Sequence, residues 1–213
     1  MCGARESPEG FASGPDIEDT SERGALACQT VETAPMTESN LGAIVGGPAR
    51  DALRAIADLL APDSTVVIDR VTLAIDYPER YVEVQNELYS QTLEKPHPEL
   101  AWFALVDALH DRKLLVWVDW NEDAAEVLGQ LRALESAPAG SWEWAQSLAM
   151  AFDRAAGLES LLARVGDNIT ETGVSLAWLD SDSDTFLIAL VPSVHGATLV
   201  ELALAAGHCV RVF

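Results

Sequence analysis

The stretch VSLAWLDSDSDTFLIALVP, residues 174–192, decides how the C-terminal part of this 213-residue chain folds. Two apolar runs, at 174–179 and 185–191, have the length and the Val, Ile and aromatic content of β-strands. Between them Asp and Ser alternate, and these residues favour turns because their side chains hydrogen-bond to nearby backbone groups. The stretch therefore predicts a β-hairpin.

The segments around this hairpin predict two further strands and a helix. HGATLVELALAAG (195–207) has the composition of an apolar helix that ends at a glycine, and HCVRVF (208–213) is typical of a short last strand. Upstream, LLVWVDW (114–120) is apolar on both faces, so we expect a strand at the centre of the sheet. The C-terminal part is thus predicted to be a β-hairpin–α–β unit joined to one earlier strand.

The N-terminal half has the spacing of helices. Apolar residues recur at steps of three and four in four segments, at about 48–60, 64–76, 78–93 and 98–110. After the first strand, Asn121 is expected to cap another helix, and Ser141 a longer one that runs to about Val165 with an interruption near Gly157. The predicted fold class is α+β (mixed α/β), with a helical N-terminal half packed on a small four-stranded mixed sheet.

Residues 1–40 differ from the rest in composition. They are rich in Gly, Ser, Glu, Thr and Pro and have few clustered apolar residues. Such a segment cannot bury enough surface to offset the entropy of ordering it, so we interpret it as a disordered tail. Met36 stands where the composition changes and is an alternative start of translation. Residues 41–213 are predicted to form a single globular domain.

The net charge of the chain indicates which classes of partner it can bind. Thirty-four Asp and Glu against 13 Lys and Arg give a formal net charge of −21. Such a surface repels nucleic acid and anionic membranes, and it attracts basic proteins or cations. We therefore expect no nucleic-acid partner and no membrane partner, and a basic protein as the candidate partner. The alternative is that the acidity only keeps the protein soluble.

The cysteines and the apolar segments bear on location. Cys2, Cys28 and Cys209 are odd in number and contain no C-x-x-C pair, a pattern that favours a reducing compartment. Cys209 is expected to be a small buried apolar residue. No signal peptide is visible, and no apolar run reaches the length of a membrane span. The predicted location is cytoplasmic, while the sequence leaves the oligomeric state open.

The aspartate turn invites a metal interpretation. Asp180, Asp182 and Asp184 fit the first three ligand positions of a calcium loop of the EF-hand type. The pattern then fails, because the sixth position is Thr185 instead of Gly and the twelfth is Val191 instead of Glu. We favour a hairpin turn without a metal or other cofactor, and keep Mg²⁺ or Ca²⁺ at these three aspartates as the alternative.

A second acidic pattern predicts a binding surface. Two strands end in Trp–aliphatic–Asp, at Asp119 and at Asp180. If these strands are parallel neighbours, both carboxylates lie at one edge of the sheet, where ligands bind in open α/β sheets. The alternative is structural, since acids at such positions cap turns and stabilise helix N-termini. The candidate binding residues are Asp119, Trp120, Glu122, Asp180 and Asp182.

The remaining sequence motifs indicate no catalytic site. The chain has no G-x-S-x-G, no phosphate-binding loop, no G-x-G-x-x-G and no H-E-x-x-H, so catalytic residues stay unassigned. Trp102, Trp117 and Trp178 are flanked by apolar residues and should be buried. Trp142 and Trp144 are expected to pack on the preceding loop, with exposure of one of them as the alternative. His208 follows a helix and should be exposed.

Several of these segments resemble a known family. WFALVDALHDRKLLVWVDWNEDAAEVLGQLRAL, followed by DSDSDTFLIALVP and a final helix and strand, is similar to the bacterial domain-of-unknown-function family 6630 over residues 48–213. Typical members have a strand that ends in Asp-Trp-Lys, whereas this chain has Asn121 at the lysine position. The later Asp-Ser-Asp-Ser is present at 180–183. The resemblance implies no activity, cofactor or site residue.

The leading functional hypothesis is a bacterial, cytoplasmic, non-enzymatic acidic binding protein. In it the protein acts as an immunity-like inhibitor or an escort of a basic partner, and the acidic residues steer association. The alternative is a divalent-metal-dependent enzyme or sensor that uses the strand-end aspartates Asp119, Asp180 and Asp182.

Overall fold

The computed structural model describes residues 46–89, 96–140, 142–180 and 184–213. All of them belong to one compact unit, Pro35–Phe213. The predicted tail 1–40 and the alternative start Met36 lie outside the described residues, so the domain boundaries remain a prediction. None of the helices in these ranges has the length and the apolar character needed to cross a membrane.

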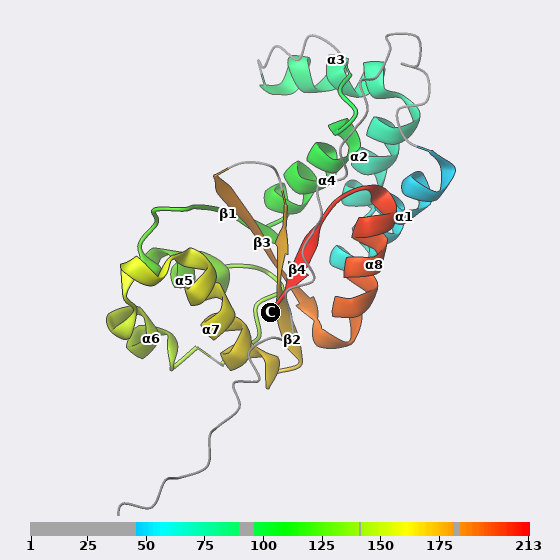
Figure 1. Ribbon diagram of the computed structural model, residues 1–213. Helices are drawn as coiled ribbons and strands as arrows, with labels where there is room; N and C mark the ends of the chain where they lie inside the picture. The colour runs from blue at the N-terminus through cyan, green and yellow to red at the C-terminus, as the bar shows by residue number, and fades with distance from the viewer. Residues whose placement is uncertain (1–45, 90–95, 141, 181–183) are drawn as a thin grey trace, which may run out of the picture. The chain divides into compact units, whose positions relative to one another are not determined.

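The first half of the described chain is helical, as predicted (Figure 1). Helix α2 had a strand-like composition but the spacing of a helix, and the spacing was the correct guide because Val67, Val71 and Ile75 lie on one buried face. Pro48 lies in the first turn of α1, where its missing N–H costs no hydrogen bond. The four helices are α1 (Gly47–Leu60), α2 (Thr65–Asp76), α3 (Pro78–Tyr89) and α4 (Leu100–Asp111).

The second half contains both strands and helices. Its elements are β1 (Leu115–Asp119), α5 (Ala124–Arg132), α6 (Ala145–Ala151), α7 (Leu158–Thr170), β2 (Val174–Leu179), β3 (Thr185–Pro192), α8 (Gly196–Ala206) and β4 (Val210–Val212). The N-cap of α5 is Asp123, so the prediction of Asn121 was wrong by two residues. The helix predicted from Ser141 to about Val165 is two helices, which are separated by residues 152–157. The predicted interruption near Gly157 is thus confirmed, and Gly157 has a φ of 77°, a conformation that favours glycine. Ser141 itself lies outside the described residues.

The sheet has the strand order β1-β3-β2-β4, and every pair in it is antiparallel. The α+β fold class and the β-hairpin–α–β unit are confirmed, but the mixed sheet is not. β1 lies at an edge of the sheet, so the prediction of a central strand was wrong. Trp117, which was expected to be buried, is 47% exposed, although Leu115 and Val118 of the same strand are buried.

Helices cover both faces of the sheet and make a core on each side (Figure 1). The core that includes α1, α2, α4 and α8 receives Leu187, Ala189 and Val191 from β3. The core that includes α5, α6 and α7 receives Ile188 and Leu190 from the same strand. Because neighbouring residues of a strand point to opposite faces, β3 must be apolar throughout. Its continuous apolar sequence reflects this double burial.

Cys209, half-buried just before β4, is disulfide-bonded. The prediction that Cys209 is a small buried apolar residue was therefore wrong. Cys2 and Cys28 lie outside the described residues. Since disulfides form mainly in oxidising compartments, the cysteine content no longer supports a cytoplasmic location, which stays a prediction.

Candidate functional site

The sheet brings Asp119 and Asp180 to the same edge. β1 and β2 are each antiparallel to β3, so they run in the same direction with β3 between them. Asp119 is the last residue of β1 and Asp180 follows the last residue of β2. The two strands are therefore not neighbours, as the prediction had assumed, but their ends do share one edge. Asp184 is exposed and directly precedes β3, so it lies at this edge as well. Asp182 lies outside the described residues.

Asp119 and Glu122 both support the turn between β1 and α5. The Oδ1 atom of Asp119 accepts a hydrogen bond from the backbone N–H of Asn121 at 2.8 Å. The backbone N–H of Asp119 donates to Oε2 of Glu122 at 3.3 Å, and Gln130 donates to Oε1 of Glu122 at 3.1 Å. The structural interpretation of these acids, in which they cap a turn, therefore holds at this position.

Large aromatic side chains stand beside these carboxylates. Trp120 is 62% exposed and directly follows Asp119, while Trp117 lies two residues before it on the same strand. The ring of His110, on α4, lies 5.3 Å from the ring of Trp117. We call Trp117, Asp119, Trp120 and Glu122 the aromatic edge. It combines exposed apolar rings with negative charge, a combination that suits Lys and Arg side chains of a partner.

Asp180 is held by a different set of residues. Its backbone N–H donates to the carbonyl of Cys209 at 3.0 Å, and its carbonyl accepts from Nε1 of Trp102 at 3.1 Å. The indole of Trp102 stacks on the ring of His208, with centroids 4.0 Å apart and an interplanar angle of 8°. The Nδ1 atom of His208 lies 3.4 Å from Oε2 of Glu99.

Sequence reasoning missed this cluster. His208 was predicted to be exposed because it follows a helix, yet only 13% of its side chain is exposed. The reason is that Trp102, which belongs to α4, covers it. Burial of Trp102 itself was predicted correctly. No local pattern connects His208 with Glu99 and Trp102, since His208 is more than 100 residues away in the sequence and meets them only in the folded protein.

Asp107 is a carboxylate with a perturbed pKa. It lies on α4, one turn before Asp111, which pairs with Arg70 of α2 at 2.7 Å. Burial raises the pKa of Asp107 above its ordinary value, and the charge of Asp111 acts in the same direction. Arg70 and His110 lower this pKa by a smaller amount. Asp107 therefore belongs to the α2–α4 contact and not to the predicted site.

The metal interpretation gains no support in the part of the chain that can be tested. Among the described residues, no three His, Cys, Asp or Glu side chains lie close enough together to hold a metal ion. Since Asp182 falls outside those residues, the candidate set of Asp180, Asp182 and Asp184 remains a prediction.

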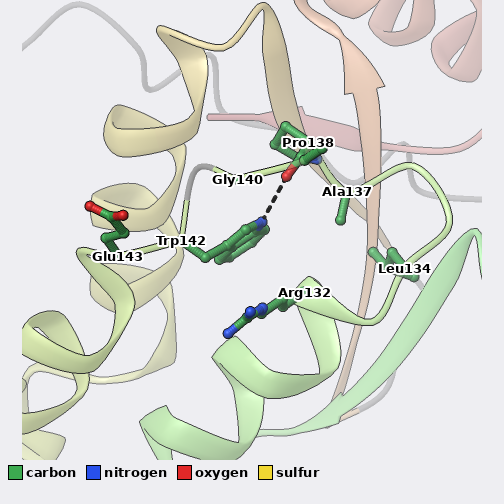
Figure 2. Close-up of a pocket in the computed structure, with 8 residues that line it drawn as sticks. Arg132, Leu134, Ala137, Pro138, Gly140, Trp142 and Glu143 are labelled. Atoms are coloured by element: carbon green, nitrogen blue, oxygen red, sulfur yellow. Dashed lines mark hydrogen bonds between the residues drawn. The ribbon is translucent and has the colours of Figure 1, made fainter.

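A shallow depression lies on the other side of the sheet, next to Trp142 (Figure 2). It has a volume of about 430 Å³, and its wall includes Arg132, Leu134, Pro138 and Trp142. Trp142 is 7% exposed and donates from Nε1 to the carbonyl of Pro138 at 3.2 Å. The expected packing of this tryptophan on the preceding loop is thus confirmed. Its ring also stacks on that of Trp144, with centroids 5.4 Å apart.

Comparison with known families identifies the chain. The family model described as Domain of unknown function (DUF6630) matches residues 52–213. The chain belongs to the DUF6630 family. The matched range contains all eight helices described except the first residues of α1, and all four strands. No curated protein and no solved structure matches the chain significantly.

Membership in DUF6630 confirms the resemblance and assigns no activity. The structure shows what the backbone of Asn121 does in the turn that follows β1. The hydrogen bond to Asp119 uses the backbone N–H of Asn121, which every residue except proline can supply. The turn therefore does not depend on which side chain stands at position 121.

Proposed function

We propose that this protein is a non-enzymatic binding protein that recognises a basic protein through the aromatic edge. The role would be that of an immunity-like inhibitor or an escort in the bacterial cytoplasm. The observation that carries the proposal is the exposure of Trp117 and Trp120 on either side of Asp119 at the end of an edge strand.

The energetics of recognition favour such a surface. Exposed Trp side chains supply much of the free energy of many protein interfaces, because a large rigid ring becomes buried at a small cost in conformational entropy. A Lys or Arg placed on an indole ring gains roughly 0.5–2 kcal/mol, depending on desolvation. The net charge of −21 adds long-range attraction, which raises the rate of association with a basic partner.

The turn that carries Asp119 and Glu122 is held by hydrogen bonds, which lowers the cost of binding. Asp119 and Glu122 are tied into the β1–α5 turn by the hydrogen bonds described above. Asp123 then caps α5 by accepting from the N–H of Ala125 at 2.9 Å, and it pairs with Arg154 at 3.0 Å. Because the turn is ordered before a partner arrives, little entropy is lost on association.

The test is an affinity capture with the full chain as bait, carried out on a lysate of the native host. Three baits are compared: the wild type, the double variant Trp117→Ala/Trp120→Ala, and the control Tyr77→Ala, which removes an equally exposed aromatic ring elsewhere. We expect one basic protein to be captured by the wild type and the control, to be lost by the double variant, and to be released at high salt. Capture of the same protein by the double variant, or of none by the wild type, would contradict the proposal.

A further inference from the structure

The hydrogen bonds around β1 show which of its backbone groups lie at the outer edge of the sheet. In an antiparallel pair, successive residues direct their N–H and C=O groups alternately toward the partner strand and away from it. Both backbone groups of Asp119 bond to Glu122, since the N–H donates to Oε2 at 3.3 Å and the C=O accepts from the N–H of Glu122 at 3.0 Å. Asp119 therefore directs these groups away from β3, and by alternation so do Trp117 and Leu115.

The pairing of the other strands gives the same orientation independently. Leu176 faces β4, because its N–H donates to the C=O of Phe213 at 3.3 Å and its C=O accepts from the N–H of Phe213 at 2.9 Å. Leu179, three residues further along β2, has the opposite orientation and faces its partner Leu187 on β3. Leu187 therefore faces β2. Trp117, which lies opposite Leu187 in the other register, must direct its N–H and C=O to the outer edge.

The two ends of this outer edge are occupied, and its middle is open. At one end Glu122 bonds to the backbone of Asp119, and at the other the C=O of Leu115 lies 3.3 Å from Nδ1 of His110. The N–H and C=O of Trp117 have no hydrogen-bond partner among the described residues. A free donor and acceptor on an edge strand form a template to which another extended chain can add.

We propose that the partner of the aromatic edge binds as an added β-strand, through an extended basic segment that exchanges two backbone hydrogen bonds with Trp117. This inference rests on the proposed function and specifies how the partner is held. In an antiparallel addition, the residue opposite Trp117 would place its side chain beside the exposed indole ring, where a β-branched residue packs well. The residue opposite Asp119 would lie beside the carboxylate, a position that suits Lys or Arg.

Charge favours a basic segment over a second copy of this chain as the added strand. Among the described residues, neither Asp119 nor Glu122 forms an ion pair, so both carboxylates are available to a cation. Two copies that paired through β1 would instead bring together these carboxylates and two chains of net charge −21. The same charges attract a basic segment.

The test uses the full chain labelled with ¹⁵N at its six tryptophans, so that the backbone amide of Trp117 can be assigned with Trp117→Phe. The probe is the peptide acetyl-Lys-Thr-Val-Thr-Lys-amide, in which the valine would lie opposite Trp117 and a lysine opposite Asp119. Two N-methylated peptides are matched controls of equal charge. N-methylation of the valine removes the N–H that would donate to Trp117, whereas N-methylation of the threonine after it removes an N–H that points away from β1.

We expect the unmodified peptide and the N-methyl-threonine peptide to shift the backbone amide resonance of Trp117 at millimolar concentration and to slow its hydrogen exchange. The N-methyl-valine peptide should bind about tenfold more weakly or worse, because a hydrogen bond is lost and the methyl group blocks the approach of the two strands.

Three outcomes would overturn the inference. Equal affinities of the three peptides, with shifts confined to the indole N–H resonances of Trp117 and Trp120, would show recognition by side chains alone and leave the proposed function intact. No shift with the unmodified peptide would exclude strand addition, and the affinity capture then decides the proposed function separately. A shift of the Trp117 amide that grows with protein concentration in the absence of peptide would show that a second copy occupies the edge.

Discussion

Trp102 and His208 stack ring on ring, 4.0 Å between centroids, and the same indole donates its N–H to the carbonyl of Asp180. The pair thereby ties α4 to the end of β2 and to the segment between α8 and β4. This corner holds the first residue of the aspartate turn in place.

Replacing Trp102 by Phe tests how much the corner contributes to stability. The change keeps an aromatic ring but leaves the carbonyl of Asp180 without its donor and opens space in the core. We expect the free energy of unfolding to fall by about 1–3 kcal/mol. Urea denaturation measures it. Trp120→Phe, at an exposed position, is the control and should change stability by less than about 0.5 kcal/mol. An equal change in the free energy of unfolding for the two substitutions would show that the contacts of Trp102 do not stabilise the protein.

Two substitutions at Asp119 separate its structural role from its charge. Asp119→Asn keeps the Oδ1 acceptor for the N–H of Asn121, so the melting temperature should stay within a few degrees of the wild type. Asp119→Ala removes the acceptor and should cost about 0.5–1.5 kcal/mol. Both should reduce capture of the basic partner in the affinity experiment, because both remove the charge. If Asp119→Asn captured the partner as well as the wild type, the carboxylate would have only the turn as its role.

Substitution of glycine by alanine is expected to have opposite effects on stability at two positions. A Cβ at Gly166, on α7, would lie 2.6 Å from the Cβ of Phe213, whereas a Cβ at Gly129, on α5, would meet nothing within 4 Å. Gly166→Ala should destabilise the protein by about 1–3 kcal/mol through overpacking. Gly129→Ala should stabilise it by up to about 1 kcal/mol, the ordinary gain in a helix. Thermal denaturation of both variants is sufficient, and stabilisation by Gly166→Ala would disprove the close approach.

Asp107 predicts a pH dependence of stability. Because burial raises its pKa in the folded state above the ordinary value of 3.8, folding favours the protonated form. Its contribution to stability is complete below the unfolded pKa and is lost as the pH rises through the folded pKa. Asp107→Asn resembles the protonated form. The difference in free energy of unfolding between this variant and the wild type should therefore be more favourable to the variant at pH 7 than at pH 3.5. Urea denaturation at both values checks this, and an unchanged difference between variant and wild type would contradict it.

Divalent cations distinguish the proposed function from its alternative. Since no group of three suitable ligands is present among the described residues, we expect millimolar Mg²⁺ or Ca²⁺ to leave the melting temperature unchanged. A rise in melting temperature that disappears in Asp180→Asn would instead support the metal-dependent enzyme or sensor, because an ion that binds only the folded state must stabilise it.

The sequence by itself determined most of the secondary structure and the α+β fold class. Helix α2 could be recognised from the spacing of Val67, Val71 and Ile75 despite its β-branched content, and the hairpin from two apolar runs around alternating Asp and Ser. Such patterns depend on neighbours within a few residues, because each helix or strand must place its own apolar side chains on a buried face.

Only the tertiary structure decided which elements are neighbours. An apolar run such as 115–119 is compatible with a central or an edge strand, and only the fold shows that β1 lies at the edge next to β3 and that Trp117 is exposed. The same holds for His208, which is buried by Trp102 from a distant helix. Strand order and these contacts follow from how whole apolar faces pack against each other, and that free energy is not encoded in the spacing of any single segment.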